Sequence, residues 1–125
     1  MFESTKAFSG FAVDDLQKAR KFYEDTLGLK VSAEHDLLTL HLAGDRDTLI
    51  YPKPDFEPAT YTILNFPVGD IDQAVDDLVA RGVRFERYDG FDQDEKGILR
   101  AQDGGPAIAW FTDPAGNILS VLEMP

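Results

Sequence analysis

The sequence predicts an α+β fold made of two similar βαβββ modules, because it contains an internal repeat followed each time by the same periodicity. The stretch FAVDDLQKA at residues 11–19 resembles FPVGDIDQA at residues 66–74. Each stretch opens with the alternation of a strand and continues with the spacing of a helix. We therefore expect one domain whose modules span about residues 5–53 and 60–125.

One amphipathic helix is expected in each module. Asp14 or Asp15 in the first module and Asp70 in the second are placed to accept hydrogen bonds from the free N–H groups at a helix start. Apolar residues then recur at three- and four-residue steps. Gly28 and Gly82 follow where a left-handed residue would end each helix.

Three further strands are expected after each helix. The first module supplies LKVSAE, LLTLHLA and TLIYP, and the second supplies VRFERY, AIAWFT and NILSVLE. The prolines of KPDFEPAT, residues 53–60, mark a short connection between the modules. Because one helix covers one face of each sheet, the other faces are expected to form a curved mixed sheet around a cleft.

Alternation along the strands predicts which side chains line that cleft. Val13 leads directly into the first helix, so its side chain is expected to lie under that helix. Every second residue of the strand, counted from Val13, then lies under the helix, and the residues between them face the cleft. The same parity applies in the second module, and to the last strand if it keeps register. The residues assigned to the cleft in this way are Phe8, Gly10, Ile63, Asn65 and Ser120.

The two histidines have different expected environments. His35 stands beside Asp36 at the turn of a predicted hairpin and is expected to be solvated. His41 alternates with apolar neighbours, so it is expected to point into the cleft. There it would contact a ligand or transfer a proton.

Aromatic residues of the second module complete the predicted site. Residues 88–106 form a long connection, and loops of this length often act as lids, so Tyr88 and Phe91 are expected to fold over the cleft. Trp110 and Phe111 are adjacent on one strand and must face opposite sides. One ring is expected in the core and the other in the cleft or a subunit interface.

Composition excludes several classes of function. The chain has 12 basic and 23 acidic residues and a net charge of −11, which disfavours nucleic acid and anionic membranes as partners. It has no cysteine, which rules out thiolate metal sites and thiol nucleophiles. No apolar run reaches the roughly 18 residues of a membrane span. The N-terminal residues do not resemble a secretory signal, so a cytoplasmic location is expected.

Two motifs resemble a known family. The first is V.DL..A..FY...LGL at residues 13–29, and the second is F.DP.GN at residues 111–117. With the paired modules, they resemble the glyoxalase/bleomycin resistance protein/extradiol dioxygenase superfamily, also called the vicinal oxygen chelate (VOC) superfamily. The resemblance covers nearly the whole chain and implies the glyoxalase/bleomycin resistance fold.

The resemblance also implies where a metal would be held. Members with enzymatic activity bind a divalent ion through His, Gln or Glu on the first and last strands of each module. Those positions fall on Phe8, Ile63, Ile50 or Tyr51, and Ser120. A serine hydroxyl is a weak ligand, and the other side chains are not metal ligands of this kind. We therefore expect no metal and no cofactor.

The sequence thus favours a metal-independent small-molecule binding protein of the glyoxalase/bleomycin-resistance type. Its expected ligand is aromatic or amphipathic, and a cationic ligand would be attracted by the negative charge. Antibiotic sequestration, and so antibiotic resistance, is one form of this function. The alternative is a VOC-superfamily lyase, isomerase or dioxygenase with an atypical metal site or with acid–base catalysis by His41 and a loop carboxylate. A third possible function is that of a partner-binding module with a residual cleft. The resemblance implies a homodimer both for the binding protein and for the enzyme.

Overall fold

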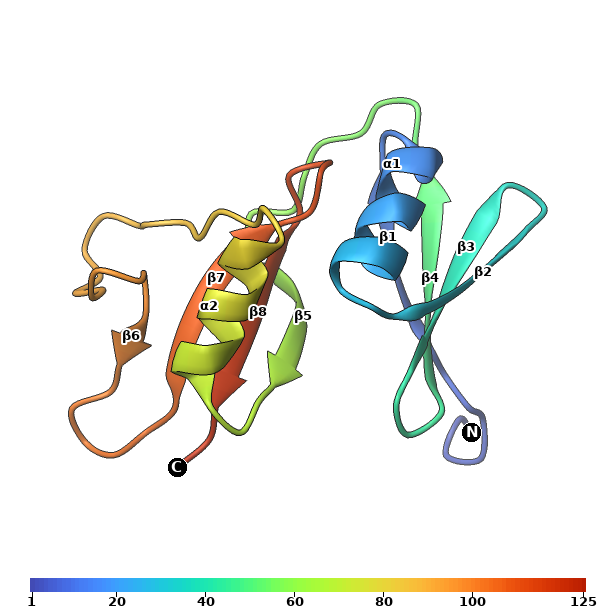
Figure 1. Ribbon diagram of the computed structural model, residues 1–125. Coiled ribbons are helices and arrows are strands. Elements are labelled where there is room, and N and C mark those ends of the chain that lie inside the picture. The colour runs from blue at the N-terminus through green and yellow to red at the C-terminus, as the bar shows by residue number, and fades with distance from the viewer. The chain divides into compact units, whose positions relative to one another are not determined.

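Each half of the chain forms a four-stranded mixed sheet with a helix packed on one face (Figure 1). The computed structural model describes residues 1–125 and divides them into two compact units, Met1–Glu57 and Pro58–Pro125. In each unit, the sheet face opposite the helix is called the open face below. No helix of the chain combines the length and apolar character needed to cross a membrane.

The first unit has the predicted element order. Its elements are β1 (Ser9–Val13), α1 (Leu16–Lys21), the π-helical turn η1 (Phe22–Thr26), β2 (Lys30–Glu34), β3 (Leu37–Leu42) and β4 (Arg46–Pro52). The strand order is β1-β4-β3-β2, with β1 parallel to β4 and the other pairs antiparallel. The helix, the three following strands and their sequence order were therefore predicted correctly.

Local sequence explains how these elements begin and end. The carboxylate of Asp15 accepts hydrogen bonds from the backbone N–H groups of Gln17 and Lys18, so it is Asp15 that caps α1. Gly28 has φ +70° and ends the helical segment in the left-handed conformation, as expected. His35 and Asp36 have φ values of 54° and 59°, which form the tight turn between β2 and β3.

The core of the first unit lies between the sheet and α1. Phe11 is buried, and its ring centroid lies 5.8 Å from that of the fully buried Tyr23. Leu40 and Ile50 are also fully buried and continue this helix-covered face. Because side chains alternate along a strand, their neighbours, including Gly10 and His41, lie on the open face.

The second unit has the same topology with a much shorter edge strand. Its elements are β5 (Thr62–Pro67), α2 (Ile71–Ala80), β6 (Leu99–Arg100), β7 (Ala107–Thr112) and β8 (Ile118–Glu123). The strand order is β5-β8-β7-β6, and β5 is parallel to β8. Helix α2 crosses the face of β7 and β8 (Figure 1). The buried side chains beneath it include Phe111, Leu119 and Val121.

The prediction of a strand at VRFERY, residues 83–88, was wrong. This segment makes only one isolated bridge, between Phe85 and Phe111, and the edge strand β6 lies instead within the expected long connection. The side chain of Gln93 explains the difference, since its amide accepts from the N–H of Tyr88 and donates to the C=O of Glu86. These backbone groups are satisfied by a side chain and not by a neighbouring strand.

The start of α2 carries the predicted Asp70 cap, without the second hydrogen bond of a capping box. The Asp70 carboxylate accepts from the N–H of Gln73 at 3.1 Å, as expected. The reciprocal half of a capping box does not form, because the Gln73 amide donates to Asp77 Oδ1. Instead, Glu123 at the end of β8 accepts from the N–H of Ile71 and ties the helix start to the sheet.

The DPAGN turn between β7 and β8 is held by two buried polar side chains. Asp113 Oδ1 accepts from the N–H groups of Ala115 and Asn117. Asn117 Nδ2 donates to Asp113 Oδ2, while its Oδ1 accepts from the N–H of Ala59. Since Asp113 and Asn117 are both almost fully buried, the motif at residues 111–117 stabilises the turn and anchors the start of the second unit.

We expect Asn117→Ala to lower the free energy of unfolding by about 1–3 kcal/mol, because it leaves the N–H of Ala59 without its acceptor and removes one hydrogen bond to the buried Asp113 carboxylate. Gln102→Ala, in an exposed loop, is the matched control and should change it by less than about 0.5 kcal/mol. Urea unfolding measures both, and equal stability of the two variants would contradict the role of the turn.

Candidate functional site

Three predicted site residues lie in one row across the second sheet. Asn65 on β5 pairs with Ser120 on β8, and Ser120 pairs with Trp110 on β7. Paired residues of adjacent strands share a face, so all three lie on the open face. Phe111, the neighbour of Trp110, is fully buried under α2, as the opposite orientation of the two rings requires.

Ser120 is committed to a structural hydrogen bond. It is 0% exposed, and its hydroxyl donates to Asn65 Oδ1 at 2.6 Å. A buried hydroxyl without a partner would cost about 1–3 kcal/mol, so Asn65 explains why a polar residue stands in the middle of β8. Asn65 itself is exposed, and the orientation of its amide leaves the Nδ2 donors available to a bound molecule.

Tyr88, Phe91 and Trp110 form an aromatic cluster beside this row. The rings of Phe91 and Trp110 are stacked, with centroids 5.4 Å apart and an angle of 27°. Tyr88 stands edge-on to both, at 5.6 Å from Trp110 and 6.1 Å from Phe91. Phe91 is 49% exposed, so the cluster presents apolar surface to solvent. The structure thus brings together five of the predicted site residues of this unit.

A negative charge lies close to the aromatic cluster. Burial raises the pKa of Tyr88 above its usual value, and the neighbouring Glu86 carboxylate raises that pKa further. Both effects favour the protonated, neutral Tyr88 hydroxyl, and only the Glu86 carboxylate among them would attract positive charge. The cluster combines aromatic faces with a nearby carboxylate.

Ile63 does not follow the simple alternation used to assign it. The pairing of β5 with β8 is irregular between Thr62 and Leu64, so Ile63 is the extra residue of a bulge. Thr62 pairs with Ile118 and occupies the open face that alternation alone assigns to Ile63. A bulge inserts one residue without a marked sequence signal, which is why the pattern did not indicate it.

In the first unit the predicted site residues are spread over the open face. Gly10 pairs with Leu49, and a Cβ atom at Gly10 would lie 3.1 Å from the Leu49 carbonyl oxygen, so the close strand approach favours glycine. Phe8 precedes β1 and is 69% exposed. It lines a cavity of about 720 Å³ that also includes Asp47.

His41 has two hydrogen-bonding partners that the sequence reasoning missed. Its Nδ1 lies 3.1 Å from Asp47 Oδ1 on β4, and its Nε2 lies 2.8 Å from Ser32 Oγ on β2. The register pairs His41 with Asp47 directly, and it sets Ser32 two residues along β2 from Lys30, which is the residue paired with His41. Only the strand register brings these residues together. Ser32 and His41 stand on strands that the sequence predicted, whereas Asp47 lies just before the predicted strand TLIYP, because β4 begins earlier, at Arg46.

The side chains present do not fit the divalent metal that the family resemblance implies. Phe8 and Ile63 have no donor atom, and Ile50 is fully buried on the helix-covered face. Tyr51 is exposed at the end of β4, and the Ser120 hydroxyl is bonded to Asn65. Nowhere in the chain do three or more His, Asp or Glu side chains gather as metal ligands.

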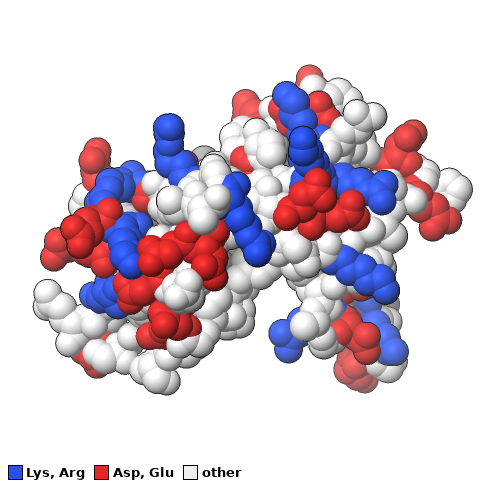
Figure 2. Space-filling view, in the orientation of Figure 1, with Lys and Arg blue, Asp and Glu red and all other residues white.

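Ion pairs dock the segment after the aromatic cluster onto α2. Arg100 donates to Asp72 at 3.0 Å, and Lys96 lies 3.2 Å from Asp76. Asp94 lies 3.4 Å from Arg100 and accepts from the N–H of Ile98, which is fully buried. Acidic and basic side chains accordingly alternate over α2 and the adjoining segment (Figure 2). The acidic loop predicted at residues 88–106 is thus held against its own unit.

Two units of strand, helix and three strands, with the first strand parallel to the last, define a protein of paired βαβββ modules. A model of the Glyoxalase/Bleomycin resistance protein/Dioxygenase superfamily matches residues 7–121. The chain belongs to this superfamily, and the fold predicted from the sequence is confirmed.

One relative is similar to this chain in sequence, and several solved structures are similar to it in fold. The uncharacterized protein YraH of Bacillus subtilis (strain 168) is 26% identical over 127 residues, which cover 90% of this chain and 92% of YraH. TnmS3, an antibiotic binding protein from Streptomyces sp. CB03234, superposes with a TM-score of 0.71 at 22% identity and 98% coverage of both chains. The fosfomycin resistance protein FosX from Listeria monocytogenes gives 0.74 at 15% identity, covering 98% of this chain and 94% of FosX.

Acidification should weaken the docking of the segment near β6. The hydrogen bond from Arg100 lowers the pKa of Asp72 in the folded protein, so its contribution is present above the unfolded pKa and is lost as pH falls through the folded pKa. We expect the melting temperature to fall more steeply below about pH 4 in the wild type than in Arg100→Gln. Arg84→Gln removes a cation that has no ion pair and should retain the wild-type slope; identical pH profiles for all three proteins would contradict this role.

Proposed function

We propose that the protein binds a small aromatic or amphipathic molecule, without a metal, on the open face of the second unit. The observation that carries this proposal is the exposed aromatic cluster beside the exposed Asn65 amide, whose Oδ1 is bonded to Ser120 and whose Nδ2 donors are available. Ligand sites in proteins typically combine apolar walls with a few oriented polar groups. Here the aromatic faces provide the apolar wall, and the Asn65 Nδ2 donors provide the oriented polar group.

The chemistry of the site narrows the class of ligand. A ring that lies against Phe91 or Trp110 would gain from stacking, which is worth about 0.5–1.5 kcal/mol beyond the area that it buries. A hydrogen-bond acceptor on the ligand would meet Asn65. Positive charge would be favoured by the Glu86 carboxylate near Tyr88, by the aromatic faces and by the net charge of −11.

The similarity to TnmS3 supports antibiotics as one source of such ligands. That protein is named as an antibiotic binding protein, and its fold matches this chain over 98% of both. Sequestration would need no chemical step, which agrees with the absence of suitable donors at the four expected metal positions. A metal-dependent enzyme of this superfamily would need a donor set that these positions do not provide.

The proposed binding protein acts as a cytoplasmic homodimer. Modules of this superfamily commonly pair through isologous contacts, and symmetric dimers are the commonest oligomers. The exposed edge strands β1 and β5, and large exposed apolar side chains such as Phe2 and Tyr61, offer surface for such pairing.

A titration followed by Trp110 fluorescence tests the proposed ligand site, since Trp110 is the only tryptophan. We expect quenching by at least one member of a panel of glycopeptide, enediyne and cationic aromatic compounds. Phe91→Ala should weaken that binding about 3- to 10-fold, by removing the stacked ring. Asn65→Ala should weaken it by a similar factor, by removing the donor.

The control for this titration is Phe2→Ala, which removes an exposed aromatic side chain outside the cluster and should bind as the wild type does. Protein dialysed against EDTA should also bind unchanged. Affinity that depends on a restored divalent metal, or binding that Phe91→Ala leaves intact, would exclude the proposed site.

Light scattering tests the proposed oligomeric state. We expect a mass about twice the 13.9 kDa of one chain at micromolar concentration, because a pair of open sheets leaves edge strands and apolar side chains to be covered. A single species at the monomer mass would refute the dimer.

A further inference from the structure

The second candidate site lies in the first unit and is independent of the aromatic cluster. Ser32, His41 and Asp47 stand on β2, β3 and β4, respectively, and share the open face of that sheet. They form one continuous chain of hydrogen bonds, with Ser32 Oγ 2.8 Å from His41 Nε2 and His41 Nδ1 3.1 Å from Asp47 Oδ1. We propose that this chain makes Ser32 a nucleophile toward the carbonyl carbon of small esters.

The hydrogen bonds set the direction of proton transfer. A carboxylate only accepts, so the bond to Asp47 requires that His41 carry its proton on Nδ1. In the neutral imidazole, Nε2 is then an acceptor and faces the Ser32 hydroxyl, which donates to it. Asp47 is a positioning residue that selects the tautomer, and His41 is the general base.

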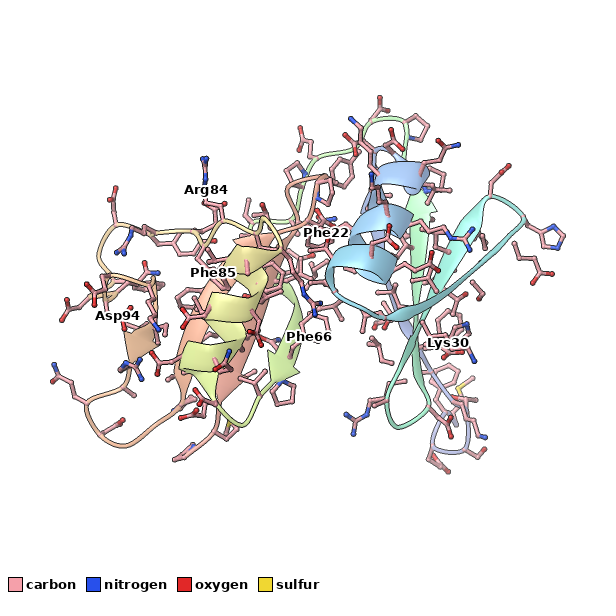
Figure 3. All side chains as sticks on the ribbon, in the orientation of Figure 1. Phe22, Lys30, Phe66, Arg84, Phe85 and Asp94 are labelled. Carbon is pink, nitrogen blue, oxygen red and sulfur yellow. The ribbon has the colours of Figure 1, made fainter.

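The surroundings leave room for a substrate. Ser32 is exposed, and the side chains of His41 and Asp47 are 33% and 55% exposed. Asp47 and the exposed ring of Phe8 line a cavity of about 720 Å³. Ser32 and His41 do not line it, so it would take a distal apolar part of the substrate and not the ester group itself. Lys30 pairs with His41 across β2 and β3, so its positive charge is on the face where the carbonyl oxygen would become negative. Lys30 is labelled in Figure 3.

The reaction is a double displacement. Ser32 Oγ bonds to the ester carbonyl carbon while its proton passes to His41 Nε2. The bond to the alcohol oxygen then breaks, and the alcohol leaves with the proton from His41. Water attacks the acyl-serine in the same way, its proton passes through His41 to Ser32 Oγ, and the carboxylic acid is released. Because water reaches all three side chains, we expect an acceleration near the lower end of the general-base range, about 100-fold.

A fluorophosphonate probe tests the nucleophile directly. When it reacts, Ser32 Oγ bonds to phosphorus, fluoride leaves and the hydroxyl proton moves to His41. We expect peptide mass spectrometry to find the adduct on Ser32 in the intact chain, and labelling to be lost in Ser32→Ala. Ser4→Ala removes an exposed serine with no histidine beside it and should label as the wild type does. Absence of an adduct, or an adduct mapped to another residue, would overturn the proposal.

Hydrolysis of p-nitrophenyl acetate separates the roles of the other two residues. We expect His41→Ala to lower kcat about 100-fold. Asp47→Asn should lower kcat with KM unchanged, because an amide can donate to Nδ1 and favour the wrong tautomer, and Asp47→Glu should recover part of the loss. Melting curves of each variant verify folding. Equal kcat for folded wild type and His41→Ala, or no recovery by Asp47→Glu, would reject the assigned roles.

Discussion

The parallel pairing of the first and last strands in each unit is the constraint on which the other features depend. In the second unit it sets Asn65 opposite Ser120, and the antiparallel strand β7 then sets Trp110 opposite the same serine. A shift of one residue would turn these side chains to the other face of the sheet. Leu119 and Val121, packed beneath α2, hold the register, since exposing either would cost about 1.5–3 kcal/mol.

The aromatic cluster depends on the segment between α2 and β6, which forms no regular strand. Between α2 and β6 the backbone keeps one hydrogen bond to β7, from the N–H of Glu86 to the C=O of Trp110, and the side chains of Gln93 and Asp94 supply others. This arrangement frees Tyr88 and Phe91 to reach Trp110, while Phe85 keeps the segment anchored on the core through Phe111. The labels of Phe85 and Asp94 in Figure 3 mark this segment. Ion pairs at exposed positions are weak, so the burial of Ile98 and the contact of Phe85 with Phe111 contribute more to holding the segment than its ion pairs do.

The two units have apolar residues at equivalent positions of their helix-covered faces, but they carry different residues on their open faces. Phe11 and Phe66 occupy matching positions of the repeat, each one residue along from the open-face position of its strand. The row of three site residues in the second unit corresponds by register to Gly10, Leu49 and Thr39 in the first. Core positions are constrained by packing, whereas open-face positions are free to change their chemistry, which explains how one fold supports unrelated sites.

The sequence by itself determined the modules, the helix caps and most strands, because these depend on local periodicity and on residues such as Asp15, Asp70 and Gly28. It also placed Asn65 and Ser120 on one face through alternation, and it left open which of Trp110 and Phe111 shares that face. Only the tertiary structure decided the bulge at Ile63, the loss of a strand at residues 83–88 and the partners of His41. Each of these depends on which residues meet across strands distant in sequence, and pairing between distant strands leaves no periodic signal in the chain.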